Sequence, residues 1–372
     1  MVKTAVILAA GLGSRLKEKT KDKPKGFLEI DSKTLIQRSV ENLLNCGIEK
    51  IYIGTGYLSE VYDEFAKRYK EIETVKSEKF ETTSSMFTLY NMKKRIDEDF
   101  LLLESDLLYE KRALMELLCD EHEDVILASG ATNSGDEVYI DADKSYFLKN
   151  MSKTKDELSF IYGELVGISK VSFSRFKQMC EIFKNQDNQK IDYEYIMVES
   201  AKDKPFYVKK IEDLIWCEID NDEHLKRAYK EILPLLNIKE WSELKVKIQK
   251  NGIKRSFEER DILFIFKGQN IGIEQHGKGK NFLRPVLVYK KFNNNHFIGF
   301  SMTSKAHNGK YYFKLKDDSF VILSQINTYS SDRIFYKSGK VSKENFKKID
   351  KQFKRLITPY EPFIGVVPSG NK

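Results

Sequence analysis

The chain has 372 residues, with 63 Lys and Arg against 56 Asp and Glu and a formal net charge of +7. This length exceeds the size at which a single hydrophobic core stops growing, so we expect two domains. The sequence contains no apolar run of roughly 18 residues, no signal-peptide pattern and no CxxC pair, which excludes a membrane-spanning helix and argues against a zinc site or a disulfide framework. We therefore expect a soluble, cytoplasmic protein.

The charge is divided unevenly along the chain. Residues from Asn237 to the end include 27 Lys and Arg and 12 Asp and Glu, a net charge of +15, which leaves 36 and 44, or −8, for residues 1–236. An acidic first part is typical of an enzyme, whereas the basic C-terminal third is expected to meet a polyanion, with nucleic acid as the first candidate.

Residues 1–236 alternate short apolar runs with amphipathic stretches, which predicts a Rossmann-like α/β domain whose mostly parallel sheet is covered by helices on both faces. Strands are predicted at Ala5–Ala9, Lys50–Ile53, Phe100–Leu103, Asp124–Ala128 and Leu165–Ile168, with an inserted hairpin strand at Glu137–Asp143. Helices are predicted at Leu35–Cys46, Val61–Tyr69, Met86–Lys94, Val171–Phe183 and Glu223–Ile232.

The pattern changes after Leu236, which predicts a second domain over residues 237–372. A helical segment at Trp241–Lys250 leads into β-type runs that Gly and Asn separate, and the amphipathic helix Lys343–Leu356 follows them. The β-type runs are Ile262–Phe266, Pro285–Tyr289, His296–Phe300, Tyr311–Leu315 and Phe320–Leu323. This order predicts a small β-barrel.

A glycine-rich segment, LAAGLGSRL at Leu8–Leu16, follows the first predicted strand. Its glycines let backbone N–H groups approach a polyphosphate, and Arg15 can pair with the charge of that group. Lys25, in Pro24-Lys25-Gly26, can bring a second cation to the same phosphates. The alternative is a tight turn between a strand and a helix with no ligand.

Two apolar runs end in carboxylates. Asp106 follows the predicted strand Phe100–Leu103, at the end of a strand where open α/β sheets place their sites, and would suit Mg²⁺. Asp220 follows a second run and can complete the same metal site. The alternatives are that Asp106 caps the next helix and that Asp220 caps a helix beginning near Asp222.

The segment Lys190–Tyr195 interleaves carboxylates with aromatic side chains, a pattern that can hold an ammonium group. Asp192 and Tyr193 are therefore candidates for binding an amine-containing substrate, with Glu137 and Tyr139 on the predicted hairpin strand as weaker ones. The alternative is a helix start with partly buried tyrosines.

Six segments of residues 1–236 together resemble the nucleotidyltransferases of the sugar-nucleotide and MobA-like superfamily, and most of all its phosphocholine and aminoethylphosphonate cytidylyltransferases. The segments are LAAGLGSRL, PKGFLEI (Pro24–Ile30), TGYLSEV (Thr55–Val61), LLLESD (Leu101–Asp106), YGELVGISK (Tyr162–Lys170) and WCEIDNDEHLKRA (Trp216–Ala228).

This resemblance implies a role for each candidate. Arg15 and Lys25 would be catalytic, Asp106 and Asp220 would hold Mg²⁺, and Asp192 would be the best candidate for binding the acceptor. The expected nucleotide-binding residues are Leu8, Ala9, Ala10, Gly11, Gly13, Ser14, Thr55, Gly56, Tyr57, Ser84 and Ser85.

The implied reaction is attack by a phosphate or phosphonate oxygen of the acceptor on the α-phosphorus of CTP, with loss of pyrophosphate. The nucleophile is already ionised, so no general base is required. The alternative acceptors are a sugar phosphate or an inositol phosphate.

The C-terminal third resembles the PemK/MazF toxin endoribonucleases over residues 238–357. The resemblance implies an SH3-like barrel that dimerises, cleaves RNA and meets an antitoxin protein, with Arg284 and Thr303 catalytic and Glu274 nearby. Ser301 stands where many relatives have Pro. The segments that carry the resemblance are Asp261–Phe264, Asn270–Lys280, Arg284–Val288, Met302–Lys305 and Leu323–Ile326.

Two alternatives stay open for this third. The barrel can bind RNA or protein without cleaving it, or the whole chain can be an RNA-directed toxin in which the first domain is a regulator.

Overall fold

A computed structural model of the protein describes residues 2–251, 255–272, 274–279, 281–305, 308–315 and 319–358. It divides into two compact units, Met1–Leu236 and Asn237–Lys372. Ile273 and Lys280, within the resemblance to PemK/MazF, lie outside the described residues. None of the described helices is long and apolar enough to cross a membrane.

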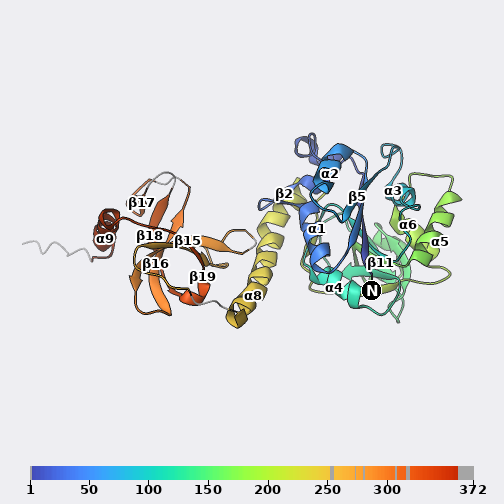
Figure 1. The fold of residues 1–372 in the computed structure, drawn as a ribbon. Helices are drawn as coiled ribbons and strands as arrows, with labels where there is room; N and C mark the ends of the chain where they lie inside the picture. The colour runs from blue at the N-terminus through green and yellow to red at the C-terminus, as the bar shows by residue number, and fades with distance from the viewer. Residues whose placement is uncertain are drawn as a thin grey trace, which may run out of the picture. The chain divides into compact units, whose positions relative to one another are not determined.

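The first unit is built on a nine-stranded sheet (Figure 1). Parallel pairs join β6 to β1, β1 to β4, β4 to β5, and β8 to β12, whereas β11 pairs antiparallel with β6 on one side and with β8 and β9 on the other. The strands are β1 (Thr4–Ala9), β4 (Lys50–Thr55), β5 (Ile72–Lys76), β6 (Phe100–Glu104), β8 (Val125–Ser129), β9 (Tyr139–Ala142), β10 (Leu148–Ser152), β11 (Gly163–Val171) and β12 (Tyr207–Ile211). The prediction of a mostly parallel sheet is confirmed, because only β11 and β10 run against the other strands.

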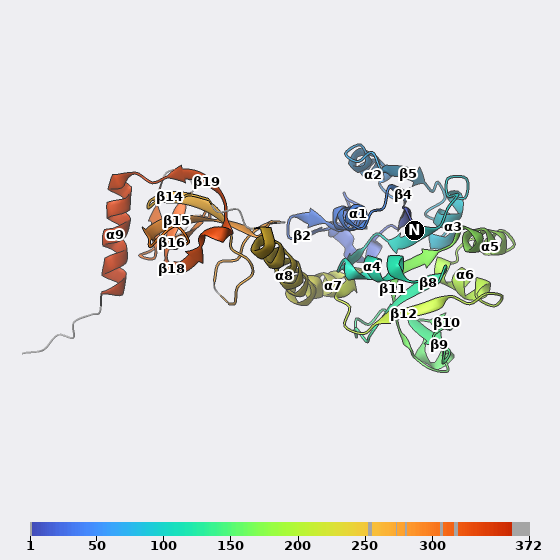
Figure 2. The ribbon, with the colours of Figure 1, turned by 60° about the horizontal axis from the view of Figure 1, so that its bottom comes forward.

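Helices cover both faces of this sheet (Figure 2). Successive residues of β1 point to opposite faces, so Val6 packs with α3, α5 and α6, while Ala5 and Ile7 pack with α1, α2 and α4. The helices are α1 (Leu35–Asn45), α2 (Ser59–Ala66), α3 (Ser85–Asn91), α4 (Arg112–Cys119), α5 (Phe173–Lys184), α6 (Tyr193–Ser200) and α7 (Asp222–Arg227). Two hydrophobic cores thus hold the sheet rigid, and its strand ends can carry a site.

Shorter elements lie around the sheet. Strand β7 (Leu107–Tyr109) pairs antiparallel with β13 (Trp216–Glu218), and β2 (Glu29–Ile30) pairs with β3 (Lys33–Thr34). Three 3₁₀ turns lie at η1 (Ser14–Lys19), η2 (Lys25–Phe27) and η3 (Lys155–Glu157). The β7–β13 pair brings the chain after β6 next to the chain before α7.

Several predicted boundaries were wrong. The helix predicted from Val171 begins at Phe173, because Val171 still pairs with Phe100 in the sheet and the side chain of Ser172 accepts a hydrogen bond from the backbone N–H of Arg175. Strand β12 was not predicted, since its sequence YVKKI carries two lysines and alternates weakly. Burial of Val208 on the sheet decides its conformation.

The domain boundary predicted after Leu236 lies within a continuous helix. Helix α8 (Leu233–Asn251) runs through that position, after a π-helical turn at η4 (Ala228–Ile232). Pro234 is the second residue of α8, which directly follows this π-helical turn, so the helical chain includes it.

The second unit holds a six-stranded antiparallel sheet in the order β17-β18-β16-β15-β14-β19. The strands are β14 (Asp261–Phe266), β15 (Leu283–Lys291), β16 (His296–Thr303), β17 (Tyr312–Lys314), β18 (Phe320–Ser330) and β19 (Ile334–Lys340), with a 3₁₀ turn η5 (Ser331–Arg333) before β19. Among the described residues, β17 and β19 are the two edges of the sheet and do not pair with each other. The observed element is therefore an antiparallel sheet, and its closure into a barrel stays a prediction.

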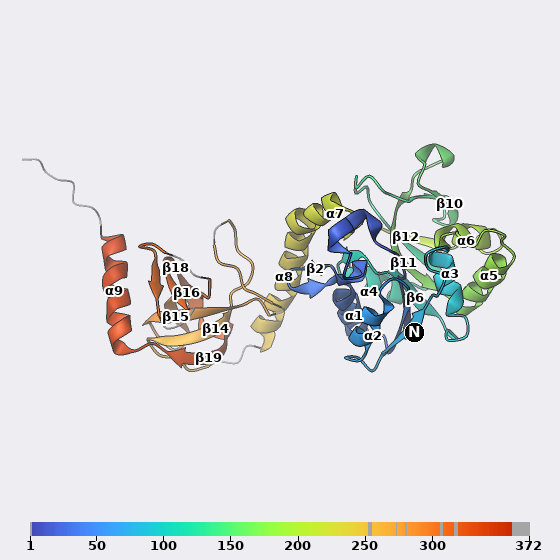
Figure 3. The same ribbon diagram turned by 90° about the horizontal axis from the view of Figure 1, so that it is seen from above.

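Helix α9 (Lys343–Ile357) lies along this sheet (Figure 3). Its Ile349 and Phe353 pack against Leu287 and Phe300 of the sheet, as the amphipathic pattern of the segment predicts. Strand β19 was not predicted, because its sequence IFYKSGK loses the apolar alternation after Tyr336.

One buried charge links α5 to the rest of the first unit and gives a test of the fold. The Nε of Arg175 lies 3.3 Å from Asp124 Oδ2, its Nη1 donates to the carbonyl of Ser200, and its guanidinium lies 4.5 Å from the centroid of the Phe206 ring. We expect Arg175→Met to lower the free energy of unfolding by about 3–5 kcal/mol, because it leaves a carboxylate buried without its cation.

The measurement is urea unfolding followed by the fluorescence of Trp216 in a Trp241→Phe background. Arg95→Met is the control, because its partner Glu73 and its own half-exposed side chain make a surface pair worth less than about 1 kcal/mol. Equal losses in the two variants would contradict the assigned role of Arg175.

Candidate active site

A cavity of about 480 Å³ opens at the carboxyl ends of β1 and β6. Its volume is within the range of small-ligand sites, roughly 300–1,000 Å³. Sequence segments far apart along the chain meet around it. The lining includes Leu8, Ala9, Ala10, Gly11, Leu12, Gly13, Ser14, Arg15, Lys25, Tyr62, Phe80, Glu81, Thr83, Ser84, Ser85, Thr88, Glu104, Ser105, Asp106, Lys190, Asp192, Tyr193, Glu194 and Asp220.

The glycine-rich loop forms one wall of this cavity. Gly13 has φ +63, a left-handed conformation that favours glycine, and its carbonyl accepts a hydrogen bond of 2.9 Å from the hydroxyl of Thr20. A Cβ atom on Gly11 would meet no atom within 4 Å, so the space above the loop is open to a ligand. The loop then enters the 3₁₀ turn η1 at Ser14.

The ammonium group of Lys25 lies among carboxylates. Its Nζ donates hydrogen bonds to Asp106 Oδ2 and Asp220 Oδ1, and it lies 3.8 Å from Glu218 Oε1. Burial alone would lower the pKa of Lys25, but Asp106 and Asp220 outweigh burial and raise that pKa well above its usual value. In turn, Lys25 overcomes the burial of Asp220 and lowers the pKa of that carboxyl to about 2. Lys25 is therefore held as a cation.

Arg15 reaches the same group of charges. Its Nη2 lies 3.1 Å from Asp220 Oδ1, and its Nη1 donates to Asp136 Oδ2. Its side chain is half-exposed. The two predicted cations and the two predicted metal ligands thus come together, although Arg15, Lys25, Asp106 and Asp220 lie far apart in the sequence.

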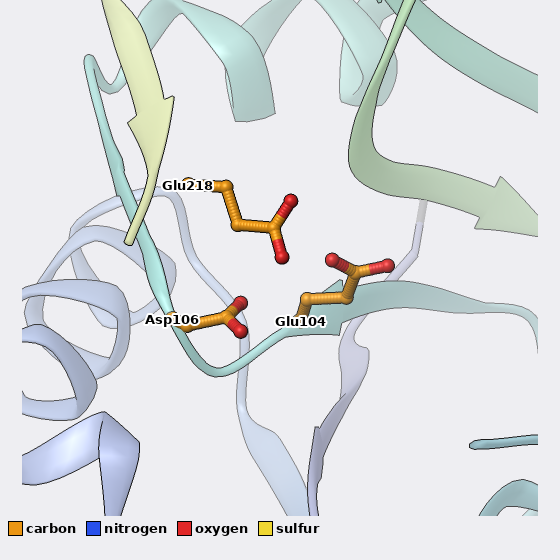
Figure 4. A group of neighbouring side chains, drawn as sticks. All are labelled: Glu104, Asp106 and Glu218. Atoms are coloured by element: carbon orange, nitrogen blue, oxygen red, sulfur yellow. The ribbon is translucent and has the colours of Figure 1, made fainter. Parts of the chain in front are cut away.

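Sequence reasoning missed two further carboxylates, Glu104 and Glu218 (Figure 4). One oxygen from each lies within 4.8 Å of the others and of an oxygen of Asp106. Burial raises the pKa of Glu104 to about 8 and that of Glu218 to about 11, with the charge of Asp106 adding to both shifts. The available signal was their spacing, because Glu104 and Glu218 each precede a predicted ligand, Asp106 or Asp220, by two residues.

The capping alternatives for the two aspartates were wrong. Asp106 is followed by strand β7, and the cap of α7 is Asn221, whose side chain accepts hydrogen bonds from the N–H groups of Glu223 and His224. Asp106 Oδ1 is buried and has no hydrogen-bond partner among the described residues. Carboxylate oxygens are the ligands that Mg²⁺ prefers, so the group Glu104, Asp106 and Glu218 fits a divalent cation.

The predicted acceptor residues Asp192 and Tyr193 line the cavity at the start of α6. Asp192 Oδ1 accepts a hydrogen bond of 3.1 Å from the hydroxyl of Ser85, which also accepts one of 2.9 Å from the N–H of Tyr193. The phenol of Tyr193 is buried and donates to Glu104 Oε1 at 2.7 Å. Ser84 and Ser85 line the cavity where α3 begins.

The weaker candidates Glu137 and Tyr139 lie apart from the main cavity. Glu137 lines an adjoining pocket, where its carboxylate accepts hydrogen bonds of 3.0 Å from the N–H of Gly135 and 3.1 Å from the hydroxyl of Tyr139. The ammonium of Lys155 lies 4.7 Å from the centroid of the Tyr139 ring. Of these two residues, Glu137 lines the adjoining pocket, and Tyr139 lines neither that pocket nor the main cavity.

Thr55, Gly56 and Tyr57 are not among the residues that line the cavity. Thr55 is fully buried at the end of β4, and a Cβ on Gly56 would lie 2.6 Å from Phe80 Cβ. The hydroxyl of Tyr57 donates to the carbonyl of Lys21 at 2.7 Å. Phe80, which packs over Gly56, lines the cavity instead.

In the second unit, the two predicted catalytic residues lie on neighbouring strands. The pairing of β15 with β16 ends at Val286 opposite Ser301, and Arg284 and Thr303 each lie two residues beyond this last pair. Arg284 Nε donates to the carbonyl of His276 at 2.7 Å, and burial lowers the pKa of Arg284. Thr303 Oγ1 accepts a hydrogen bond of 3.2 Å from the N–H of Lys305. Glu274 is exposed in the loop before β15.

The first unit is similar to known proteins in sequence and in fold. Residues 5–165 match the model of the MobA-like NTP transferase domain. The fold is also similar to solved structures, among them an inositol-1-phosphate CTP transferase from T. maritima (TM-score 0.54, 18% identity, covering 62% of this chain and 94% of that one). A CTP:phosphocholine cytidylyltransferase from Streptococcus pneumoniae is similar too (TM-score 0.54, 20% identity, covering 62% of this chain and 99% of that one).

Three curated relatives are similar in sequence. A CTP:phosphoglutamine cytidylyltransferase of Campylobacter jejuni is 25% identical over 241 residues, which cover 58% of this chain and 95% of the relative. A UTP–glucose-1-phosphate uridylyltransferase of Haloferax volcanii is 34% identical over 27% of this chain and 42% of the relative. A choline-phosphate cytidylyltransferase of Streptococcus pneumoniae is 32% identical over 28% of this chain and 46% of the relative. This chain therefore spans less than half the length of the last two.

The position of Lys25 leads to a prediction about cation binding. Because its ammonium occupies oxygens of both Asp106 and Asp220, a divalent cation must compete with it. We expect Lys25→Met to bind Mn²⁺ at least about tenfold more tightly than the wild type when no nucleotide is present, a change of about 1.4 kcal/mol.

The measurement is a titration of free Mn²⁺ by electron paramagnetic resonance. Lys21→Met, which removes an exposed lysine of the same loop, is the control and should leave the affinity unchanged. If Lys25→Met binds Mn²⁺ no more tightly than the wild type, Lys25 does not compete for the site.

Proposed function

We propose that the N-terminal unit, whose residues 5–165 match the MobA-like NTP transferase domain, transfers CMP from CTP to a small phosphorylated or phosphonylated amine, with release of pyrophosphate. The observation that carries the proposal is the meeting of Lys25 with Asp106 and Asp220 beside the open glycine-rich loop. Cations and backbone donors for a polyphosphate thus adjoin carboxylates for a divalent cation.

The reaction exchanges one bond for another. An oxygen of the acceptor's phosphate or phosphonate forms a bond to the α-phosphorus of CTP, and the bond from that phosphorus to the β-phosphate oxygen breaks, so its electron pair leaves with pyrophosphate. Both reactants are anions, and Arg15 and Lys25 offset their repulsion. Gly11, Gly13 and Ser14 supply backbone N–H groups to the phosphates.

Glu104, Asp106, Glu218 and Asp220 would hold a divalent cation, which we take to be Mg²⁺. When bound, such a cation neutralises negative charge on the phosphates and on the leaving group. Lys25 leaves its two carboxylates when the phosphates of the nucleotide offer it new acceptors. While Lys25 contacts the carboxylates, their charges raise its pKa and keep it positively charged.

The choice of CTP and of an amine acceptor is supported by two relatives with CTP or choline phosphate in their names, one of which aligns over 95% of its length. The competing proposal is a sugar-phosphate or inositol-phosphate acceptor, supported by the uridylyltransferase relative and by the inositol-1-phosphate enzyme of the same fold. The site itself is acidic, which favours an acceptor with a cationic end.

Removal of the Asp106 carboxylate tests the proposed chemistry. We expect Asp106→Asn to reduce pyrophosphate release from CTP by at least about a hundredfold, since it removes a metal ligand and a partner of Lys25 while keeping the side-chain shape. The assay compares four nucleoside triphosphates with phospho-amines and with glucose 1-phosphate, with and without EDTA. Wild-type turnover that persists in EDTA, or that requires UTP and glucose 1-phosphate, would refute the corresponding part of the proposal.

For the second unit we propose RNA cleavage by a PemK/MazF-like domain with an SH3-like barrel, in which Arg284 stabilises charge on the reacting phosphate and Thr303 positions the 2′-hydroxyl. The specific observation in favour is that Arg284 and Thr303 lie on the neighbouring strands β15 and β16, each two residues beyond their last pair. The net charge of +15 would hold the strand. A homodimer and an antitoxin protein belong to this proposal, and binding of RNA without cleavage is the alternative.

Loss of the Arg284 guanidinium separates cleavage from binding. In EDTA, which stops metal-dependent chemistry, we expect the full chain to cleave single-stranded RNA and Arg284→Ala to abolish cleavage while retaining most of the binding. One cation among 27 contributes little to the general field but is not replaced at the reacting phosphate.

The measurement is a gel of labelled RNA. Lys290→Ala, which removes an exposed lysine of the same strand, is the control and should cleave normally. RNA that is bound but stays intact across several sequences would leave binding as the function of this unit.

A further inference from the structure

A small pocket of about 90 Å³ adjoins the main cavity. We call it the side pocket. It shares Arg15, Glu104, Glu194 and Asp220 with the lining of the main cavity, so a molecule bound there can extend one end into it. Its other lining residues are Thr132, Ser134, Asp136, Glu137, Val138, Lys153, Glu164, Leu165, Val166, Gly167, Trp216, Cys217, Glu218 and Arg227.

Most charged groups of the side pocket already have partners. Arg15 and Lys153 pair with Asp136, and Arg227 lies 3.5 Å from Glu231. Glu164 Oε2 accepts a hydrogen bond of 2.8 Å from the N–H of Thr132. The cations Arg15, Lys153 and Arg227 of the side pocket are therefore each close to a carboxylate.

Glu194 feels the charge of Lys153 but has an unsatisfied oxygen. Its Oε2 is buried and receives no hydrogen bond from any described residue. Burial and the neighbouring charge of Asp192 raise the pKa of Glu194 to about 7. A buried carboxylate without a donor costs free energy, and a bound cation with N–H groups would remove that cost. Trp216 Nε1, on the same pocket, is likewise buried without a hydrogen-bond partner among the described residues.

We propose that the side pocket binds a primary ammonium group of the acceptor, with Glu194 as its counter-ion. The proposal rests on the proposed transferase function. Asp192 is the less suitable counter-ion, because Ser85 already donates to its Oδ1. A metal ion at Glu194 is not favoured, because the carboxylate oxygens that converge among the described residues are those of Glu104, Asp106 and Glu218.

The pocket favours a primary over a quaternary ammonium. A quaternary ammonium has no N–H to donate to Glu194 and is recognised mainly by several aromatic faces. Trp216 is the one aromatic residue in the described lining of the side pocket. The phosphate or phosphonate end of the same molecule would remain in the main cavity near Arg15, within reach of the nucleotide.

The experiment compares phosphoethanolamine, phosphocholine and n-propyl phosphate as acceptors for the full chain with CTP. For the wild type we expect a KM for phosphoethanolamine at least about tenfold below those for the other two. Glu194→Gln should raise that KM about ten- to a hundredfold, a much larger change than in the KM for CTP or for n-propyl phosphate. Glu194→Asp, which keeps the charge, should recover part of the loss.

Glu199→Gln is the matched control, because it removes an exposed carboxylate of the same helix and should change nothing. Calorimetric binding of phosphoethanolamine without CTP separates the two proposals. If no acceptor yields pyrophosphate but binding is lost in Glu194→Gln, the side-pocket proposal stands and the transferase proposal fails. If other phosphates react while phosphoethanolamine binds equally well to wild type and Glu194→Gln, or binds to neither, the side-pocket proposal is overturned.

Discussion

The candidate active site depends on one interaction, the contact of the Lys25 ammonium with Asp106 and Asp220. Asp106 follows a strand of the central sheet, Asp220 follows the β7–β13 pair, and Lys25 lies in a short 3₁₀ turn between β1 and β2. Without the cation, the charges of Asp106 and Asp220 would lie unpaired beside two further carboxyl groups, those of Glu104 and Glu218. The interaction therefore joins three separate chain segments and keeps a strongly acidic site compatible with a folded protein.

The sheet makes this meeting possible because both its faces are buried. Side chains of β1 alternate between two hydrophobic cores, so a slip by one residue would move Val6 and Ile7 each into the core packed for the other. The strand ends are consequently fixed, and the loop that leaves β1 and the carboxylates that leave β6 lie at the same edge. Rigid strand ends position the charges, while Gly11 and Gly13 leave the backbone open to a ligand.

The sequence alone predicts those features of the site that depend on the order of residues within one segment. The apolar run before Asp106 predicts a strand with a carboxylate at its end, and the glycine-rich segment predicts an open loop after β1. The sequence did not indicate that Glu104 and Glu218 lie close to Asp106. Their proximity depends on the pairing of β7 with β13, and each of these strands has only three residues. The resemblance also implied Thr55 and Tyr57, but Thr55 is buried at the end of β4 and the hydroxyl of Tyr57 donates to the carbonyl of Lys21.

The balance of charge explains how an acidic site can serve anionic substrates. With no substrate, the carboxylates hold Lys25 and Arg15, so the cations that phosphates require are kept in place and ionised. A nucleotide that arrives with a divalent cation offers a new partner to each charged group. The metal replaces the Lys25 ammonium at Asp106 and Asp220, and the phosphates of the nucleotide take the place of these carboxylates at Lys25. Neither exchange is favourable alone, because each would leave a buried charge unpaired. Binding of metal and nucleotide is therefore coupled by charge neutrality, and a zwitterionic acceptor that places its ammonium at Glu194 extends the same balance into the side pocket.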